Sequence, residues 1–166
     1  MSFTDLIVGS QSDTPADVYI SGALQGSRDL GHAKVLYQHA ARVFQDAGVD
    51  VYVPHQHLAA TPADARLMSP EEVFDRDAFH LLGARLVVAF IHEHSTGVGS
   101  ELAMAVTHEI PTVALHHNGL APSRFTEGLL RRANIAIYSY RDPWRELPEL
   151  LSSFATALAT SEALVA

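Results

Sequence analysis

Residues 95–105 of this chain read Ser-Thr-Gly-Val-Gly-Ser-Glu-Leu-Ala-Met-Ala. They follow the strongly apolar residues 84–91, which predict a strand, and they run directly into a helical pattern. Gly97 and Gly99 let the backbone approach a ligand closely, and Glu101 falls in the first turn of the expected helix. A strand, a glycine loop and a helix start together favour phosphate binding at free N–H groups. The carboxylate of Glu101 indicates that such a site also carries out chemistry on its ligand.

The rest of the chain repeats this alternation of strand and helix. Short apolar runs predict five strands, at residues 17–23, 49–53, 84–91, 112–115 and 135–138. Apolar spacing and capping residues predict helices at residues 30–47, 70–82, 99–109, 123–132 and 143–158. Residues 57–66 are expected to form a polar loop. We therefore expect a three-layer Rossmann-like (flavodoxin-like) α/β fold, in which helices flank a five-stranded parallel sheet. In such folds, ligands bind beyond the carboxyl ends of the strands.

Composition limits the possible partners. The 166 residues suit one domain, and hydrophobic residues make up 48% of them, so a sizeable core can form. The net charge of −8 argues against nucleic acid or an anionic membrane surface as the main partner. Cysteine is absent, which excludes disulfides and a thiol nucleophile. Neither a signal peptide nor a membrane-spanning run is recognised, so we expect a cytoplasmic protein. Residues 1–16 are interpreted as a flexible leader and residues 17–166 as a single domain.

A second polar segment, residues 21–29, also follows a predicted strand and precedes a predicted helix. It reads Ser-Gly-Ala-Leu-Gln-Gly-Ser-Arg-Asp. It lacks the third glycine of a dinucleotide fingerprint and the Gly-Lys-Ser/Thr of a Walker A loop. Two interpretations stay open: a cradle for a phosphate or a sugar, or an ordinary turn with Arg28 in solvent.

Two acidic residues are candidates for catalysis. Glu101, if kept ionised by the helix dipole, would serve as a nucleophile or a charge stabiliser; the alternative is an acid that only complements the dipole. Asp75 and Asp77 are two residues apart in one predicted helix, so they do not share a helix face. Asp77 has more apolar neighbours and is the better candidate to point at the site, where it would hold a sugar hydroxyl or donate a proton. The alternative for either aspartate is a solvated helix charge.

The chain contains 10 histidines, several of them near the expected carboxyl ends of strands. No His-Glu-x-x-His pattern occurs, and alternate residues on a strand point in opposite directions, so we expect no metal site. His55 is the first choice for a contact to a base or a sugar, against the alternative of histidines in water. Ser100 lacks the following glycine of a nucleophile elbow, which argues against a serine hydrolase.

Taken together, these segments resemble the nucleoside 2-deoxyribosyltransferase superfamily. The superfamily includes the 2'-deoxynucleoside 5'-phosphate N-hydrolases and the CMP or hydroxymethyl-CMP hydrolases, to which the pattern is most similar. The resemblance runs in order from residue 17 to residue 115, and beyond that it is architectural. It is carried by residues 18–22, 26–28, 51–52, His55, 69–70, Asp77, 84–89, 95–105 and 111–115.

This resemblance implies a retaining glycosidase that acts on N-glycosyl compounds without a cofactor or a metal. Glu101 would match the nucleophile that attacks C1' of the sugar, Asp77 the aspartate near the sugar and the leaving base, and Tyr19 a residue that orients the nucleophile. Water would then release the sugar from a covalent glycosyl-enzyme intermediate. Residues that would contact the substrate or its phosphate are Gly22, Gly26, Ser27, Arg28, His55, Ser95, Gly97 and Gly99.

One departure from the transferases points to the substrate. Six residues before the nucleophile they carry an aspartate that holds the 5'-hydroxyl, whereas this chain has Ser95. A carboxylate would repel a 5'-phosphate, and a hydroxyl beside N–H groups would accept it. The sequence therefore favours a nucleoside 5'-monophosphate as substrate and water as acceptor. Gln25 stands where some nucleotide hydrolases have a basic residue, which leaves Arg28 as the nearest cation.

Three alternatives stay open at this point. A second base could intercept the intermediate, which would make the protein a (deoxy)ribosyltransferase. The substrate could be NAD or a cytokinin-type riboside monophosphate, although the Gly-Gly-x-Gly-Thr-x-x-Glu loop of those phosphoribohydrolases is absent. The chain could also be a non-catalytic nucleotide sensor. The resemblance further implies a small-molecule partner and a homodimer or higher homo-oligomer, in which residues 116–124 would complete a neighbour's pocket.

Overall fold

The computed structural model describes residues 14–24, 27–57 and 68–163. Gly26, most of the expected leader and nearly all of the expected 57–66 loop lie outside this range. The strands are β1 (Val18–Ser21), β2 (Val51–Tyr52), β3 (Leu86–Phe90), β4 (Thr112–His117) and β5 (Ala136–Tyr140). The helices are α1 (Leu30–Gln45), α2 (Pro54–His57), α3 (Pro70–Gly83), α4 (Thr96–Thr107), α5 (Arg124–Arg132) and α6 (Pro143–Ala163).

The five strands form one sheet in the order β2-β1-β3-β4-β5. Every neighbouring pair is parallel, and β1 pairs with β3 through the register Val18↔Leu86 to Ser21↔Ala89. This confirms the expected fold class, because the order 2-1-3-4-5 is that of flavodoxin-like proteins. The chain order reverses between β1 and β3. A ligand is therefore expected beyond the carboxyl ends of these two strands.

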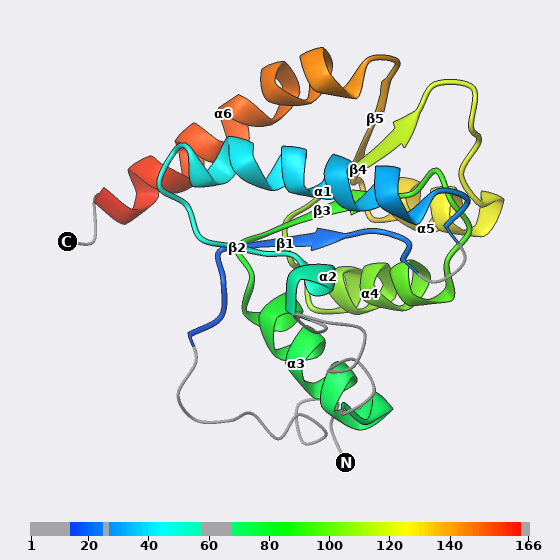
Figure 1. Cartoon of the computed structure of the whole chain (residues 1–166), viewed down its shortest axis with the longest axis horizontal. Coiled ribbons are helices and arrows are strands. Elements are labelled where there is room, and N and C mark those ends of the chain that lie inside the picture. The colour runs from blue at the N-terminus through cyan, green and yellow to red at the C-terminus, as the bar shows by residue number, and fades with distance from the viewer. Residues whose placement is uncertain (1–13, 25–26, 58–67, 164–166) are drawn as a thin grey trace.

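Helices cover both faces of the sheet (Figure 1). Val18 and Ile20 of β1 face a core that they share with residues of α1 and α6. Tyr19 faces the opposite core, which includes Leu81 of α3, Leu102 of α4 and Leu130 of α5. Alternate residues of a strand point to opposite faces, so β1 contributes to both cores. No helix in the described part of the chain is long and apolar enough to cross a membrane.

The start of α4 differs from the sequence prediction. The helix begins at Thr96 rather than at Gly99, so both glycines lie inside it. Ser95 is the N-cap, and its Oγ accepts a hydrogen bond from the N–H of Val98 at 3.4 Å. Glycine lowers helix propensity by about 1 kcal/mol, which is why the pattern alone placed the start too late; the capping serine overrides this penalty. Glu101 consequently lies in the second turn, not the first.

Two further boundaries have a clear local cause. The capping box of α3, in which Ser69 and Glu72 bond each other's backbone N–H, agrees with the predicted start at Pro70. The short helix α2 was not predicted, and His57 lies in it rather than in a loop. Proline is favoured at the first position of a helix, so Pro54 suits the start of α2.

Gly22 is required by packing against α1. A Cβ at this position would lie 2.3 Å from Cζ of Tyr37. The Tyr37 ring is buried, and its hydroxyl donates a hydrogen bond to the carbonyl of Ala23 at 3.0 Å, so it has little freedom to move.

We therefore expect Gly22→Ala to lower the free energy of unfolding by about 1–3 kcal/mol, the usual cost of overpacking. Chemical denaturation monitored by circular dichroism measures this. Gly99→Ala is the control, because a Cβ at Gly99 would meet nothing within 4 Å. Equal losses for the two variants would contradict the packing role of Gly22.

Candidate active site

The centre of the candidate site is the carboxylate of Glu101. Its Oε1 accepts a hydrogen bond from the hydroxyl of Tyr19 at 2.9 Å. Its Oε2 accepts one from the hydroxyl of Ser21 at 2.5 Å. Both donors belong to β1, and both are completely buried. Each carboxylate oxygen is therefore held by a separate hydroxyl at the carboxyl end of a central strand.

The alternation of β1 and the helical start of α4 produce this arrangement. Tyr19 and Ser21 are two residues apart, so they point to the same face of the sheet. Glu101 comes from the second turn of α4, which packs on that face. The helix dipole falls off beyond the first turn, so the sequence-based explanation for an ionised Glu101 does not hold. The two hydroxyl donors stabilise the carboxylate instead.

Burial and hydrogen bonding act in opposite directions on Glu101. Burial raises the pKa of its carboxyl group above 4.5, the hydrogen bonds from Ser21 and Tyr19 lower it, and the nearby charge of Asp77 raises it again. Burial also raises the pKa of Tyr19 far above its ordinary value, and the charge of Glu101 adds to this rise. Tyr19 therefore remains a protonated donor over the working pH range. The carboxylate that it contacts is a poorly solvated base with a raised pKa.

A second carboxyl group, that of Asp77, lies within electrostatic range of Glu101. Its Oδ1 accepts a hydrogen bond from the hydroxyl of Tyr52 at 2.6 Å. The same hydroxyl accepts a hydrogen bond from Nε of Arg76 at 2.9 Å, and that nitrogen lies 3.7 Å from Oδ1 of Asp77. Because Arg76 occupies the acceptor side of the Tyr52 hydroxyl, that hydroxyl is fixed as a donor to Asp77.

The environment of Asp77 favours proton donation. Burial raises the pKa of its carboxyl group, while the hydrogen bond from Tyr52 and the charge of Arg76 lower it. A carboxyl group with a raised pKa keeps its proton closer to neutral pH, as a general acid must. Glu101 and Asp77 thus form a pair of partly buried carboxyl groups in different hydrogen-bond environments.

Stacked rings connect the two carboxyl groups. Tyr19 and Tyr52 are direct neighbours in the register of β1 and β2, and their ring centroids are 5.6 Å apart. The Tyr52 ring also stacks on two histidine rings, each nearly parallel to it. The centroid distance is 4.5 Å to His57 and 3.9 Å to His80. Aromatic packing therefore orients both tyrosines that donate to the carboxylates.

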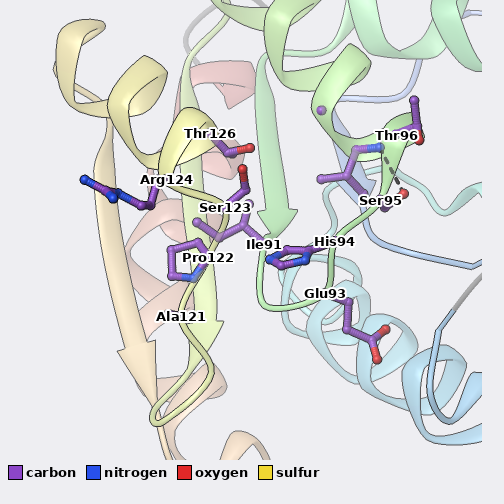
Figure 2. Close-up of a pocket in the computed structure, with 12 residues that line it drawn as sticks. Ile91, Glu93, His94, Ser95, Thr96, Ala121, Pro122, Ser123, Arg124 and Thr126 are labelled. Carbon is purple, nitrogen blue, oxygen red and sulfur yellow. Dashed lines mark hydrogen bonds between the residues drawn. The ribbon is translucent and has the colours of Figure 1, made fainter.

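Ser95 lines a different part of the site. It borders a pocket of about 550 Å³ between the start of α4, which carries Thr96, and the start of α5, with Ser123 and Thr126 beside it (Figure 2). Gly99 also lines this pocket, whereas the described lining residues do not include Glu101. Ser95 and Glu101 are six residues apart on α4, or about 9 Å along the helix axis.

The two glycines of α4 have no packing requirement. A Cβ at Gly97 would make only an ordinary contact, 3.7 Å from Oγ of Ser95, and a Cβ at Gly99 would meet nothing within 4 Å. Helical glycine costs stability relative to alanine. The bare backbone at these positions leaves space beside Ser95 that a ligand can use.

Three residues that the sequence predicted to contact the substrate, Ser27, Arg28 and His55, lie in other parts of the structure than Glu101 and Asp77. Ser27 and Arg28 line a pocket with His92 and Glu93, and the Arg28 N–H donates a hydrogen bond to Oε1 of Glu93 at 3.0 Å. His55 lies against α1, with its Nε2 3.4 Å from Nε2 of Gln38. Burial lowers the pKa of His55 to about 4, so its ring is neutral at physiological pH. The structure does not place these residues in the hydrogen-bond network of Glu101 and Asp77.

Sequence reasoning missed three members of this network. Ser21 is two residues after Tyr19 on one strand, so the alternation of β1 could have identified it. Tyr52 gave no local signal, because its bond to Asp77 joins β2 to α3. Arg76, next to Asp77 on α3, enters the network through its bond to Tyr52. No group of three or more His, Cys, Asp or Glu side chains suited to a metal ion occurs among the described residues.

No family model matches the chain, but its sequence is similar to proteins that are named as nucleotide N-hydrolases. A Methanosarcina mazei protein with the provisional name 2'-deoxynucleoside 5'-phosphate N-hydrolase 1 is 27% identical over 141 residues, which cover 85% of this chain and 84% of that protein. A Methanococcoides burtonii protein with the same provisional name is 25% identical over 99 residues, or 60% of this chain and 79% of that protein.

Solved structures share the fold. A conserved protein from Enterococcus faecalis superposes with a TM-score of 0.62 at 20% identity, covering 84% of this chain and 99% of that chain. The 2-deoxyribosyltransferase of Bacillus psychrosaccharolyticus superposes with a TM-score of 0.54 at 17% identity, covering 79% of this chain and 89% of that chain. In sequence and in fold, the resemblance of this chain to the nucleoside 2-deoxyribosyltransferase superfamily is therefore confirmed.

Proposed function

We propose that this chain is a hydrolase that cleaves the N-glycosidic bond of a nucleoside 5'-monophosphate, releasing the free base and (deoxy)ribose 5-phosphate. The observation that carries this proposal is the partly buried Glu101 carboxylate, held by two hydroxyls at the switch point beside a second partly buried carboxyl group. The provisional names of the relatives agree with an N-hydrolase. In addition, this chain has Ser95 at the position where the transferases carry an aspartate.

In the first chemical step, an oxygen of Glu101 attacks C1' of the sugar. The C1'–N bond breaks, its electron pair goes to the base nitrogen, and the Asp77 carboxyl group donates a proton to the leaving base. The product is an ester between C1' and Glu101. Tyr19 and Ser21 hold the nucleophile in position, because their hydrogen bonds fix both carboxylate oxygens before attack.

In the second step, water attacks C1' and breaks the ester. Asp77, now a carboxylate, accepts the water proton, and Glu101 leaves as a carboxylate. Both carboxyl groups thereby return to their starting states. The hydrogen bond from Tyr52 stabilises the ionised Asp77 in this half of the reaction. Two inversions at C1' make the overall reaction retaining.

The pocket beside Ser95 would hold the 5'-phosphate. It offers the hydroxyls of Ser95, Ser123 and Thr126 near the N-terminus of α4, and Arg124 lines it as well. A helix N-terminus favours an anion. The separation between Ser95 and Glu101 along α4 is on the scale of one nucleotide, as expected if the substrate spans both.

A base-release assay tests the proposal. Ribo- and 2'-deoxyribonucleoside 5'-monophosphates and the matching nucleosides are incubated with the protein, and free base is measured by chromatography. We expect base release from at least one monophosphate, and faster release from it than from its nucleoside. Absence of base release from the whole panel would overturn the proposal.

Ser95→Asp should reverse the preference for a phosphate. Aspartate is a good N-cap, so the start of α4 is retained, but its charge would repel the 5'-phosphate. We expect kcat/KM for the monophosphate to fall at least about tenfold relative to the nucleoside. Steady-state kinetics on both substrates measures this ratio. Ser95→Asn is the control of equal size, and a ratio shifted equally by both variants would contradict the role of charge.

A transferase is the second candidate, because one structural neighbour is a 2-deoxyribosyltransferase. The same glycosyl intermediate would then react with a second base instead of water. Adding a foreign base to the assay distinguishes the two reactions: a new nucleoside or nucleotide appears only if transfer occurs.

We also propose a homodimer. Phe125, which is 86% exposed at the start of α5 beside the Ser95 pocket, supports a contact there.

A further inference from the structure

A second pocket of about 340 Å³, which shares Glu93 with the Ser95 pocket, lies where the start of α1 meets the start of α6. We call it the α1/α6 pocket. Leu36 of α1, Pro143 and Trp144 of α6 and Leu120 give it apolar walls. Its polar lining includes Ser27, His92, Glu93 and Tyr140, together with the charged residues Arg28, Asp29 and Arg141 and the histidines His32 and His117. Apolar walls with a few convergent polar groups are typical of sites for small molecules.

Among the described residues, four polar atoms of the α1/α6 pocket lack partners. Within the part of the chain that the structure describes, four buried atoms at this pocket make no hydrogen bond: Ser27 Oγ, His92 Nδ1, Glu93 Oε2 and the Tyr140 hydroxyl. Tyr140 is only 2% exposed. A buried polar atom without a partner costs free energy, and such atoms are few in native proteins. Their concentration at one pocket indicates that a ligand satisfies them.

The available atoms define the chemistry of that ligand. Burial lowers the pKa of His92 and raises that of Tyr140, so both side chains stay neutral at physiological pH. Each can then donate one hydrogen bond and accept another. Glu93 accepts only, and one of its oxygens already accepts from the Arg28 N–H, so its Oε2 has room for a single donor. The ligand therefore needs one donor group next to an acceptor.

A neutral ring fits this pattern better than an ammonium ion. The pocket is lined by two arginines, Arg28 and Arg141, and by two carboxylates, Asp29 and Glu93, so its charges balance and no net charge favours an ion over a neutral ligand. The indole of Trp144, 45% exposed, offers a flat surface against which an aromatic ring can stack. An exocyclic amine beside a ring nitrogen supplies the required donor and acceptor.

We propose that the α1/α6 pocket is a second binding site, for a free nucleobase or similar small heteroaromatic ring that carries an exocyclic amine. The amine would donate to Oε2 of Glu93, and the adjacent ring nitrogen would accept from the Tyr140 hydroxyl. The pocket lies against the core formed by α1 and α6, whereas Tyr19 and the Glu101 carboxylate that it contacts lie on the opposite face of the sheet. The inference is therefore independent of turnover at Glu101.

Ligand binding at this site can be followed by tryptophan fluorescence. Trp144 is its single tryptophan and lines the α1/α6 pocket. Cytosine and uracil are the probes, because they have the same ring size and differ at the exocyclic amine. We expect cytosine to change the tryptophan fluorescence of the wild-type protein with a saturable, one-site titration curve. Uracil should bind at least about fivefold more weakly, because it reverses the two groups: a carbonyl replaces the amine that faces Glu93, and an N–H replaces the ring nitrogen that accepts from Tyr140.

Tyr140→Phe tests the contact directly. It removes only the unpartnered hydroxyl, so we expect the melting temperature to stay unchanged or to rise. Cytosine binding should weaken about fivefold or more through the lost hydrogen bond. Tyr138→Phe is the matched control, because Tyr138 lies on the same strand, is 38% exposed and does not line the pocket. Its cytosine affinity should equal that of the wild-type protein.

Three results would overturn the proposal. The first is the absence of a saturable fluorescence change with cytosine. The second is equal affinity for cytosine and uracil. The third is equal cytosine affinity in the wild-type protein and a folded Tyr140→Phe variant. None of these measurements requires N-glycosidic cleavage, so failure of the proposed function leaves the test intact.

Discussion

Glu101→Gln is expected to reduce base release from the preferred nucleoside 5'-monophosphate by about 10⁴-fold or more, the scale on which removal of a nucleophile acts. Glutamine has nearly the same size and can still meet the hydroxyls of Tyr19 and Ser21. Its amide oxygen is a much poorer nucleophile than a carboxylate, so the glycosyl ester should not form. Single-turnover measurement of the released base gives the rate of this step.

The stability of Glu101→Gln separates a chemical role from a structural one. Burial raises the pKa of Glu101 in the folded state above the unfolded value of 4.5. The unfolded chain therefore loses this proton first, and the wild-type protein loses stability as the pH rises from 4.5 through the folded-state pKa. Glutamine does not ionise, so above that window the variant should melt at the same or a higher temperature.

Exposed Glu149 provides the matched control. Its side chain is 72% exposed on α6, so Glu149→Gln removes a charge without touching the site. We expect wild-type base release and a nearly unchanged melting temperature. An active Glu101→Gln variant, or one that is inactive only because it is unfolded, would contradict the assignment of Glu101 as the nucleophile.

Asp77→Asn is expected to slow base release by about 10²- to 10⁴-fold, the usual contribution of a general acid and base. Asparagine keeps an oxygen to accept the hydrogen bond from Tyr52, and Arg76 keeps its bond to Tyr52, so the fold should be retained. The variant cannot protonate the leaving base. Its loss should therefore be smallest for substrates whose base leaves easily without a proton, and largest for poor leaving groups.

The comparison with Asp75→Asn makes this prediction specific. Asp75 lies two residues earlier on the same helix, α3, and carries the same charge. We expect Asp75→Asn to retain most of the activity. The pH profile gives a second readout: the limb that reflects protonated Asp77 should disappear in Asp77→Asn only. Equal losses in both variants, or a loss independent of the leaving group, would contradict the role of Asp77.

The fold was predictable because its signals are local. Short apolar strands alternate with amphipathic helices, and this alternation predicted a parallel five-stranded sheet that the order β2-β1-β3-β4-β5 confirms. The start of α4 was predicted too late, because two glycines conceal a helical turn that Ser95 caps. The short helix α2 was missed for a different reason: it contains only four residues, which are too few to show an apolar periodicity.

The candidate site was predictable in its acids and in Tyr19, but not in its other hydrogen-bond partners. Glu101 and Asp77 could be selected from their neighbours in the sequence, and their roles stay predictions. Among the partners that set their charge states, Ser21 and Tyr52 reach the acids from strands far away in the chain, and Arg76, next to Asp77, is held by its bond to Tyr52. The same holds for the α1/α6 pocket, where Tyr140 meets residues from the other end of the chain.

Mass spectrometry of the enzyme during turnover tests the central claim most directly. A 2'-fluoro-2'-deoxynucleoside 5'-monophosphate is suitable, because the fluorine withdraws electrons and slows breakdown of the glycosyl ester. After acid quench and proteolysis, the account predicts that the peptide containing Glu101 gains the mass of the fluorinated sugar phosphate, and that Glu101→Gln does not. Base release with an unmodified Glu101 peptide, or with the sugar attached to another residue, would contradict it.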